Sequence, residues 1–193
     1  MRIFVIEGLD GSGKTTQCEM LKKKFTVVKF PNDSKLIQKY LNKEYGEKVN
    51  PYAVSSLFAI DRYLTLSKFR EHQTIICDRY ITSNFIYQPK SIIRWIERYE
   101  YELLGIPKPE GVIFLNMPPK FANKLIKKRG TKRDIYESNY KYLKEVYKRG
   151  LEVAKERSWF VIDCVENNEI KSPENIHKEI LERLEYWVYK IAF

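Results

Sequence analysis

Eight residues near the amino terminus read Gly8-Leu9-Asp10-Gly11-Ser12-Gly13-Lys14-Thr15 and match the pattern G-x-x-x-x-G-K-[ST] without a gap. A short apolar run at residues 2–6 precedes the match, and a helical pattern follows it over residues 14–25. This strand–loop–helix context is the one in which the pattern forms a phosphate-binding loop. The stretch therefore predicts a nucleotide-binding α/β fold.

The residue types in this loop suit a nucleoside triphosphate. Glycines let successive backbone N–H groups approach phosphate oxygens, and the start of a helix adds positive potential. Lys14 can reach the β- and γ-phosphates, and the Thr15 hydroxyl can ligate Mg²⁺. We therefore expect ATP·Mg²⁺ as a ligand and assign its phosphate contacts to Gly8, Leu9, Asp10, Gly11, Ser12, Gly13, Lys14, Thr15 and Thr16.

Outward from the loop, short apolar runs alternate with helical patterns. We predict strands at residues 2–6, 26–30, 74–77, 111–115 and 159–163. Helices are predicted at residues 14–25, 51–69, 91–104 and 138–157, from an Asn32 or Asp33 cap to residue 41, from Pro118 or Pro119 to about 129, and from Pro173 onward. This alternation indicates a five-stranded parallel sheet with helices on both faces, in three layers, with ligands at the carboxyl ends of the strands.

Composition narrows the class of protein. A chain of 193 residues suits a single domain, expected here to span residues 1–193. No apolar run approaches the length of a membrane span, so no membrane association is expected. The 3 cysteines are scattered without metal-type spacing, which favours a reducing cytoplasm over a disulfide framework. The net charge of +10 suits polyanionic partners, either nucleotide phosphates or nucleic acid.

An acid and a cation follow the third predicted strand directly. Asp78 would lie at the ligand-binding edge of the sheet, where its carboxylate can hold Mg²⁺ through water. Arg79 beside it can bind a second phosphate group with two hydrogen bonds. The pair therefore favours an enzyme that handles two phosphorylated ligands.

Residues 120–133 carry many basic side chains and no acid. Phosphoryl transfer needs positive charge over the migrating group and the exclusion of water. We expect a basic lid at about residues 128–138 with a hinge at Gly130. Arg129 and Arg133 are its candidate catalytic cations.

Several segments together resemble the thymidylate kinase family, in order and over most of the chain: residues 6–17, 30–31, 57–62, 78–88, 114–119 and 134–137. The resemblance implies a fold like that of nucleoside monophosphate kinases, with a lid and an acceptor-binding region at about residues 30–70. It also implies a cytoplasmic homodimer with ATP and dTMP as substrates and Mg²⁺ as cofactor.

The same resemblance assigns roles to single residues. Phe58 would stack on thymine, Arg62 would bond a thymine carbonyl, and Asn84 would meet the polar edge of the base. Arg79 would hold the acceptor phosphate, and Tyr87 would crowd the 2′ position of the sugar. The implied acceptor-binding set is Asp10, Phe30, Phe58, Arg62, Arg79, Ser83, Asn84, Tyr87, Gln88 and Tyr136, and the catalytic set is Lys14, Asp10, Arg79, Arg129 and Arg133.

Two positions depart from the pattern seen in some family members. No arginine stands inside the phosphate loop, so the catalytic cation should come from Arg129 or Arg133, with Lys132 as a substitute. No arginine follows Phe30-Pro31, so Lys29 or Lys35 would contribute at that point instead.

The predicted reaction is direct transfer of the γ-phosphoryl group of ATP to dTMP, giving dTDP and ADP in dTTP biosynthesis. One rival is another monophosphate kinase or a deoxynucleoside kinase, for which Glu7 could serve as the base that activates a 5′-hydroxyl. A rival from another class is a nucleotide-dependent nucleic-acid-binding protein, supported by the net charge alone. No interleaved aromatic and basic motif is visible, so no stable nucleic-acid partner is expected.

Overall fold

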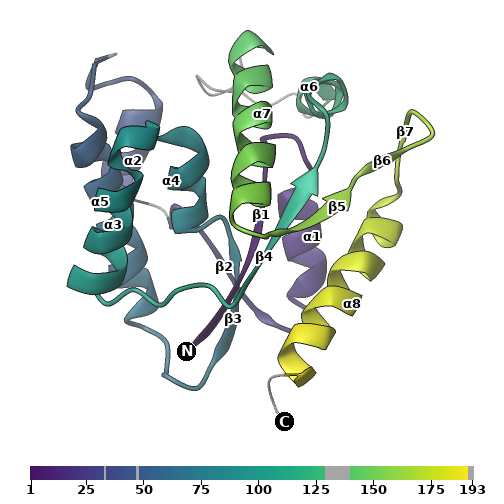
Figure 1. Cartoon of the computed structure of the whole chain (residues 1–193), viewed down its shortest axis with the longest axis horizontal. Coiled ribbons are helices and arrows are strands. Elements are labelled where there is room, and N and C mark those ends of the chain that lie inside the picture. Colours follow the sequence, from purple (N-terminus) through teal and green to yellow (C-terminus); the bar gives the residue numbers. More distant parts are fainter. Residues whose placement is uncertain (33, 47, 129–139, 191–193) are drawn as a thin grey trace.

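The α/β fold expected from the sequence is confirmed in the computed structural model, which describes residues 1–32, 34–46, 48–128 and 140–190 (Figure 1). Five parallel strands form one sheet in the order β2-β3-β1-β4-β5. The strands are β1 (Arg2–Gly8), β2 (Thr26–Lys29), β3 (Thr74–Asp78), β4 (Gly111–Asn116) and β5 (Phe160–Asp163).

Helices cover both faces of this sheet, and Figure 1 shows α1 and α8 on one side and α3, α4 and α5 on the other. Alternate residues of β1 enter the two layers of the core: Phe4 and Ile6 pack with α1 and α8, and Ile3 and Val5 with α3–α5. The helices in the described residues are α1 (Lys14–Leu21), α2 (Lys35–Leu41), α3 (Pro51–Leu66), α4 (Ile81–Tyr87), α5 (Ile93–Glu97), α6 (Pro119–Lys128), α7 (Tyr140–Glu156) and α8 (Pro173–Lys190).

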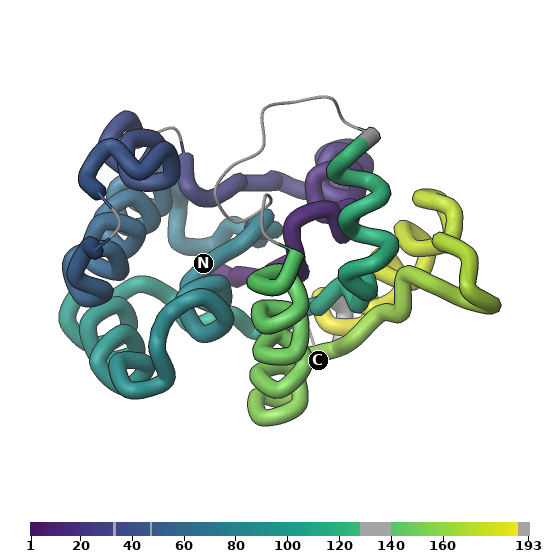
Figure 2. The backbone as a smooth tube through the Cα atoms, turned by 90° about the horizontal axis from the view of Figure 1, so that it is seen from above, coloured from purple at the N-terminus to yellow at the C-terminus, as the bar shows by residue number. Residues whose placement is uncertain are grey.

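Strand register brings the predicted motifs to one edge. In β1, Ile6 is level with Asp78 of β3, and Gly8 is level with Leu115 of β4. The loop after β1 therefore lies beside the segment that follows β3, at the point where the strand order reverses, and ligands collect at such points. Figure 2 looks down on the molecule and shows this loop close to α6 and α7, with α2 and α3 across from it.

Several predicted helix boundaries are wrong. Helix α1 ends at Leu21 and α3 at Leu66, each followed by tight turns instead of a further helical turn. The cap of α2 is Ser34 and not Asn32, since the Ser34 hydroxyl accepts from the N–H of Ile37 at 3.4 Å, and the other candidate, Asp33, lies outside the described residues. The Asn32 side chain donates to Thr65 instead, at 3.2 Å.

The helix predicted at residues 91–104 is divided into three parts. A 3₁₀ turn, η1 (Lys90–Ile92), leads into α5, and a π-helical segment, η2 (Arg98–Leu103), follows it. The N–H of Leu104 donates to the carbonyl of Tyr99 at 3.0 Å, which is the five-residue spacing of a π-helix. Sequence periodicity does not distinguish this wider turn from an α-helical one.

Two elements were not predicted at all. Helix α4 has the sequence ITSNFIY, which is rich in β-branched and aromatic residues that favour strands. It is helical because Ile81, Phe85 and Ile86 are buried against the sheet and its helices, so tertiary packing overrides local preference. The second element is a small antiparallel pair, β6 (Val165–Glu166) and β7 (Glu169–Ile170).

The described residues contain no helix that is long and apolar enough to cross a membrane. Cys18, Cys77 and Cys164 are buried free thiols, as the scattered cysteine pattern predicted, and burial raises the pKa of each.

Candidate functional site

A cavity of about 600 Å³ opens at the carboxyl edge of the sheet. It brings together segments that are far apart in the chain, from the loop after β1, from α3, and from the end of β3 through α4. Most of the predicted site residues line it, namely Asp10, Gly11, Gly13, Lys14, Thr15, Phe30, Phe58, Arg62, Asp78, Arg79, Ser83, Asn84, Tyr87 and Gln88.

Other predicted residues lie elsewhere. Leu9 and Ser12 are buried beneath the loop, Gly8 is buried at the end of β1, and Thr16 is exposed on α1. Of the two lysines offered as substitutes for a missing arginine, Lys29 lines the cavity and Lys35 does not. The expected lid cations Arg129, Lys132 and Arg133, and the acceptor contact Tyr136, fall outside the described residues.

Glycine is required in the loop by backbone shape and by crowding. Gly11 has a φ of 80°, and a Cβ there would lie 2.6 Å from the carbonyl oxygen of Ala122 in α6. Gly8 has a φ of 151°, and a Cβ there would lie 2.8 Å from the Ser12 hydroxyl. A larger residue at either position would therefore strain the loop, and at Gly11 it would also push the loop away from α6.

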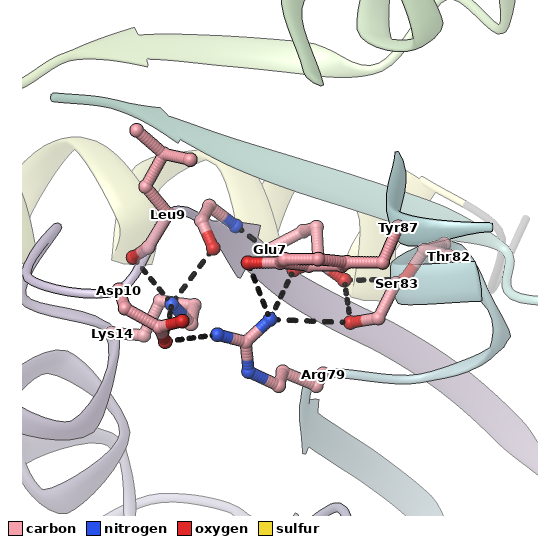
Figure 3. Close-up of polar contacts among 9 residues, drawn as sticks. Glu7, Leu9, Asp10, Lys14, Arg79, Thr82, Ser83 and Tyr87 are labelled. Atoms are coloured by element: carbon pink, nitrogen blue, oxygen red, sulfur yellow. Dashed lines mark hydrogen bonds and ion pairs between the residues drawn. The ribbon is translucent and has the colours of Figure 1, made fainter. Parts of the chain in front are cut away.

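Lys14 is held inside the loop by backbone carbonyls. Its Nζ atom donates to the carbonyl oxygens of Gly8 and Leu9, at 2.8 and 2.6 Å, and lies 4.0 Å from a carboxylate oxygen of Asp10 (Figure 3). The side chain is buried, and this burial, with Arg79 nearby, lowers the pKa of Lys14 to about 8. The loop therefore orders this cation before any phosphate binds.

We expect the binding of ATP to drive proton uptake in mildly alkaline solution. With a pKa of about 8, Lys14 is mostly neutral in the free protein at pH 9, while the triphosphate favours its charged form and raises the pKa on binding. Titration calorimetry at pH 9, in buffers of different ionisation enthalpy, should give uptake of about one proton per ATP, and close to none at pH 6.5. A Lys14→Met variant should show no uptake at pH 9.

Arg79 joins the phosphate loop to α4. Its guanidinium pairs with Asp10, lies 3.5 Å from Glu7, and is within 3.5 Å of the Ser83 hydroxyl and 3.4 Å of the Tyr87 hydroxyl (Figure 3). Burial opposes the charged form, but the Asp10 and Glu7 carboxylates outweigh it and raise the pKa of Arg79 well above its ordinary value. Arg79 is therefore a permanent cation at the wall of the cavity.

The backbone of Arg79 has a φ of 69°, which is unusual for a residue with a side chain. Its N–H donates to the carbonyl of Ile6 at 3.2 Å, so the chain turns sharply as it leaves β3. The turn directs the chain from the sheet edge into α4 within a few residues. A positive φ at a residue with a side chain is a form of backbone strain that is often found at functional sites.

Glu7 has no capacity left to act as a base. The carboxylate is completely buried and accepts hydrogen bonds from the hydroxyls of Thr82 and Ser83, at 2.8 Å each. Its second oxygen accepts from the N–H of Gly8 at 3.1 Å and faces Arg79. The geometry therefore assigns Glu7 to the support of Arg79 and α4, and it removes the sequence argument for a deoxynucleoside kinase.

The end of the cavity away from the phosphate loop has the features of a binding site for a planar nucleotide base. Phe58 is half-buried, and its ring meets that of Tyr40 edge-on with centroids 6.2 Å apart. Arg62 and Asn84 line the same end and are both bound to Glu100. The α2 residues of this wall, Gln38, Tyr40 and Leu41, were not predicted, because no motif in the sequence marks them.

The residues expected to hold Mg²⁺ fit a site in which the phosphates of the bound nucleotide supply part of the metal coordination. Thr15 and Asp78 both line the cavity, and within the described ranges no three His, Cys, Asp or Glu side chains gather into a metal site. Mg²⁺ commonly binds through one or two protein oxygens, with phosphate oxygens and waters completing its coordination. The hydroxyl of Thr15 and the carboxylate of Asp78 match that pattern.

Comparison with known proteins agrees with this geometry. A family model described as thymidylate kinase matches residues 6–180. A protein of Methanocaldococcus jannaschii named probable thymidylate kinase is 32% identical, over 92% of this chain and 93% of its own. The thymidylate kinase of Schizosaccharomyces pombe is 29% identical, over 94% of this chain and 90% of its own.

The fold is also that of a solved structure. A thymidylate kinase from Candida albicans superposes with a TM-score of 0.74 at 24% identity, covering 95% of this chain and 91% of that one. Because the family model and the similar sequences extend over nearly the whole chain, this protein belongs to the thymidylate kinase family.

Proposed function

We infer that the chain transfers the γ-phosphoryl group of ATP to dTMP, giving dTDP and ADP in the synthesis of dTTP. The observation that carries this conclusion is that one cavity is lined by Lys14 of the phosphate loop, by Arg79 as a second cation, and by Phe58 at the end proposed for the base. These features correspond to the donor phosphates, the acceptor phosphate and the acceptor base.

The residues act chiefly by placing charge. Arg79 holds the phosphate of dTMP close to the loop, and Lys14 neutralises the γ-phosphoryl group as it moves. An oxygen of the dTMP phosphate attacks the γ-phosphorus in line while the bond to the ADP oxygen breaks. No base is needed because the attacking phosphate oxygen is already an anion. Mg²⁺, held by Thr15 and through water by Asp78, would supply further charge neutralisation at the phosphates.

Recognition of the acceptor would follow from the far end of the cavity. We propose that Phe58 stacks on thymine, that Arg62 donates to a thymine carbonyl, and that Asn84 meets the base edge. Tyr87 would crowd the 2′ position of the sugar and favour deoxyribose. Asp10, already paired with Arg79, would lie near the sugar and phosphate of the acceptor and near the metal.

The domain organisation, the lid and the acceptor-binding region of the chain stay predictions. We propose one domain over residues 1–193 with a lid at about 128–138, in which Arg129 or Arg133 supplies the cation that the phosphate loop lacks. An acceptor-binding region at about residues 30–70 is supported by Phe30, Phe58 and Arg62 in the cavity wall. The cytoplasmic location and the lack of a stable nucleic-acid partner also stay predictions.

We propose a homodimer that forms through the outer surface of α3. Tyr63 and Leu64 lie three and four residues after Ile60 on this helix, and Ile60, Tyr63 and Leu64 are 40%, 46% and 56% exposed. A Leu64→Lys substitution should shift the protein to monomers in sedimentation equilibrium. The control is Leu103→Lys, at a leucine that is 66% exposed on η2, and this substitution should leave the dimer intact. If the Leu64→Lys protein stayed dimeric, the interface would lie elsewhere.

A coupled ADP-release assay tests the proposed reaction. With ATP·Mg²⁺ as donor, the acceptors dTMP, dUMP, dCMP, dGMP, AMP, UMP and thymidine are compared in parallel. We expect clear preference for dTMP and no turnover of thymidine, since Glu7 is fully engaged. Turnover of thymidine without dTMP would instead support a nucleoside kinase.

Arg79→Gln should separate acceptor binding from donor binding. Loss of a charged partner for the acceptor phosphate should raise the KM for dTMP by about 100-fold, while the KM for ATP stays within about threefold. Steady-state kinetics with each substrate varied in turn measures both constants. If both KM values rose equally, Arg79 would be a support of the loop and not an acceptor contact.

A further inference from the structure

A buried ion pair lies behind the base end of the cavity. The Nε and Nη2 atoms of Arg62 donate to Glu100 at 2.7 and 2.5 Å. The two side chains are 2% and 1% exposed. Arg62 lines the cavity, whereas Glu100 does not. Glu100 can therefore influence a bound base only through its neighbours.

Asn84 is the third member of this cluster. Its Nδ2 atom donates to Oε1 of Glu100 at 3.2 Å, and the residue is 4% exposed and lines the cavity. A carboxylate paired with a guanidinium accepts hydrogen bonds and donates none, so Asn84 must turn its NH₂ group toward Glu100. The amide oxygen of Asn84 is thereby turned away from Glu100 and kept as an acceptor.

Glu100 thus acts on two cavity groups at once, because it fixes the position of Arg62 and decides which end of the Asn84 amide faces the cavity. It uses two donors of Arg62 and leaves the remaining guanidinium N–H groups as donors only. Removing water from a buried charge is costly, so this arrangement persists only while Arg62 and Asn84 both stay bound to Glu100. Glu100 belongs to η2, whose π-helical turn is of a kind frequent at functional sites.

We propose that Glu100 is a positioning residue that selects the base of the acceptor nucleotide by holding Arg62 as a donor and Asn84 as an acceptor. The inference rests on the proposed function of the cavity. Thymine and uracil offer a carbonyl acceptor at C4 beside an N3–H donor, which complements this pair. Cytosine offers an amino donor and an N3 acceptor, so both contacts would be mismatched.

Replacement of Glu100 by glutamine tests the proposal, because it keeps the volume and changes the hydrogen-bonding pattern. Both oxygens of Glu100 accept from Arg62, and Oε1 also accepts from Asn84. In either orientation the glutamine NH₂ group therefore removes an acceptor from Arg62, and at the Oε1 position it also forces the Asn84 amide to turn over and present a donor to the cavity. We expect the ratio of kcat/KM for dTMP to kcat/KM for dCMP to fall at least about tenfold. The ratio for dTMP to dUMP should stay constant, since the two bases share this edge.

Glu97→Gln is the matched control. Glu97 ends α5 shortly before Glu100, pairs with Arg157 at 2.8 Å, and does not line the cavity. Its dTMP to dCMP ratio should stay within twofold of that of the wild type. Where Glu100→Gln fails to fold by circular dichroism, Glu100→Asp takes its place. The shorter carboxylate keeps a charge opposite Arg62 but loses its reach to Asn84, so the ratio should fall again.

The outcomes separate a positioning role from a structural one. Equal loss of kcat/KM for dTMP and dCMP in a folded Glu100 variant, with the ratio unchanged, would overturn the proposal and leave Glu100 as a structural residue. A wild-type protein that fails to phosphorylate dTMP would contradict the proposed function instead. A lowered ratio in a Glu100 variant, with an unchanged ratio in Glu97→Gln, supports the positioning role.

Discussion

Replacing Lys14 with methionine should reduce kcat/KM by at least about 10³-fold, with ATP·Mg²⁺ as donor and dTMP as acceptor. The loop holds this ammonium with the carbonyls of Gly8 and Leu9, so the charge stands ready where the γ-phosphoryl group moves. Methionine keeps the aliphatic volume and removes the charge. Steady-state kinetics at saturating dTMP measures the loss.

A second substitution at the same position separates charge from shape. In Lys14→Arg the cation is kept, but the planar guanidinium does not fit between two carbonyls that hold a compact ammonium. We expect a loss of at least about 100-fold in this variant as well.

The control is Lys22→Met, in which an exposed lysine that follows α1 and pairs with Glu19 is lost. It should keep its activity within about twofold, because a surface ion pair contributes little. Activity of Lys14→Met within tenfold of the wild type, with the protein folded, would show that Lys14 is not the cation that stabilises transfer.

Replacing Arg62 with methionine should lower the free energy of unfolding by about 3–5 kcal/mol. The substitution leaves the Glu100 carboxylate buried without its cation, and the loss of one member of a buried pair is strongly destabilising. Urea denaturation followed by tryptophan fluorescence measures the change. The variant should also lose measurable affinity for dTMP, because the donor to the base is gone.

The double variant Arg62→Met/Glu100→Leu should recover most of that stability without recovering dTMP binding. Two apolar side chains of similar volume remove both buried charges, and such replacements are often neutral or stabilising. Arg98→Met is the control, since Arg98 pairs with Glu102 at 4.0 Å on the exposed side of η2. Its effect should stay within about 0.5 kcal/mol. A double variant as unstable as Arg62→Met would show that packing, and not the uncompensated charge, causes the loss.

The phosphate end of the site could be predicted because its requirements are local. A glycine at positive φ, a lysine at the start of a helix and a strand just before it lie within a few residues of one another. The sheet could be predicted for the same reason, since buried strands appear as apolar runs. Local signals did not identify α4 or the π-helical η2, because burial against the sheet and neighbouring helices decides those conformations.

The fold class, the phosphate loop and the family can all be inferred from the order of residues alone, since each depends on residues in a fixed short order. By contrast, the contact of Glu7 with Arg79 and those of Glu100 with Arg62 and Asn84 become visible only in the folded chain. The chain has 25 acidic residues, and nothing in their order says which one will meet Arg62 from 38 positions away. A buried charge finds its partner through the packing of whole helices and strands, and such packing leaves no local pattern in the sequence.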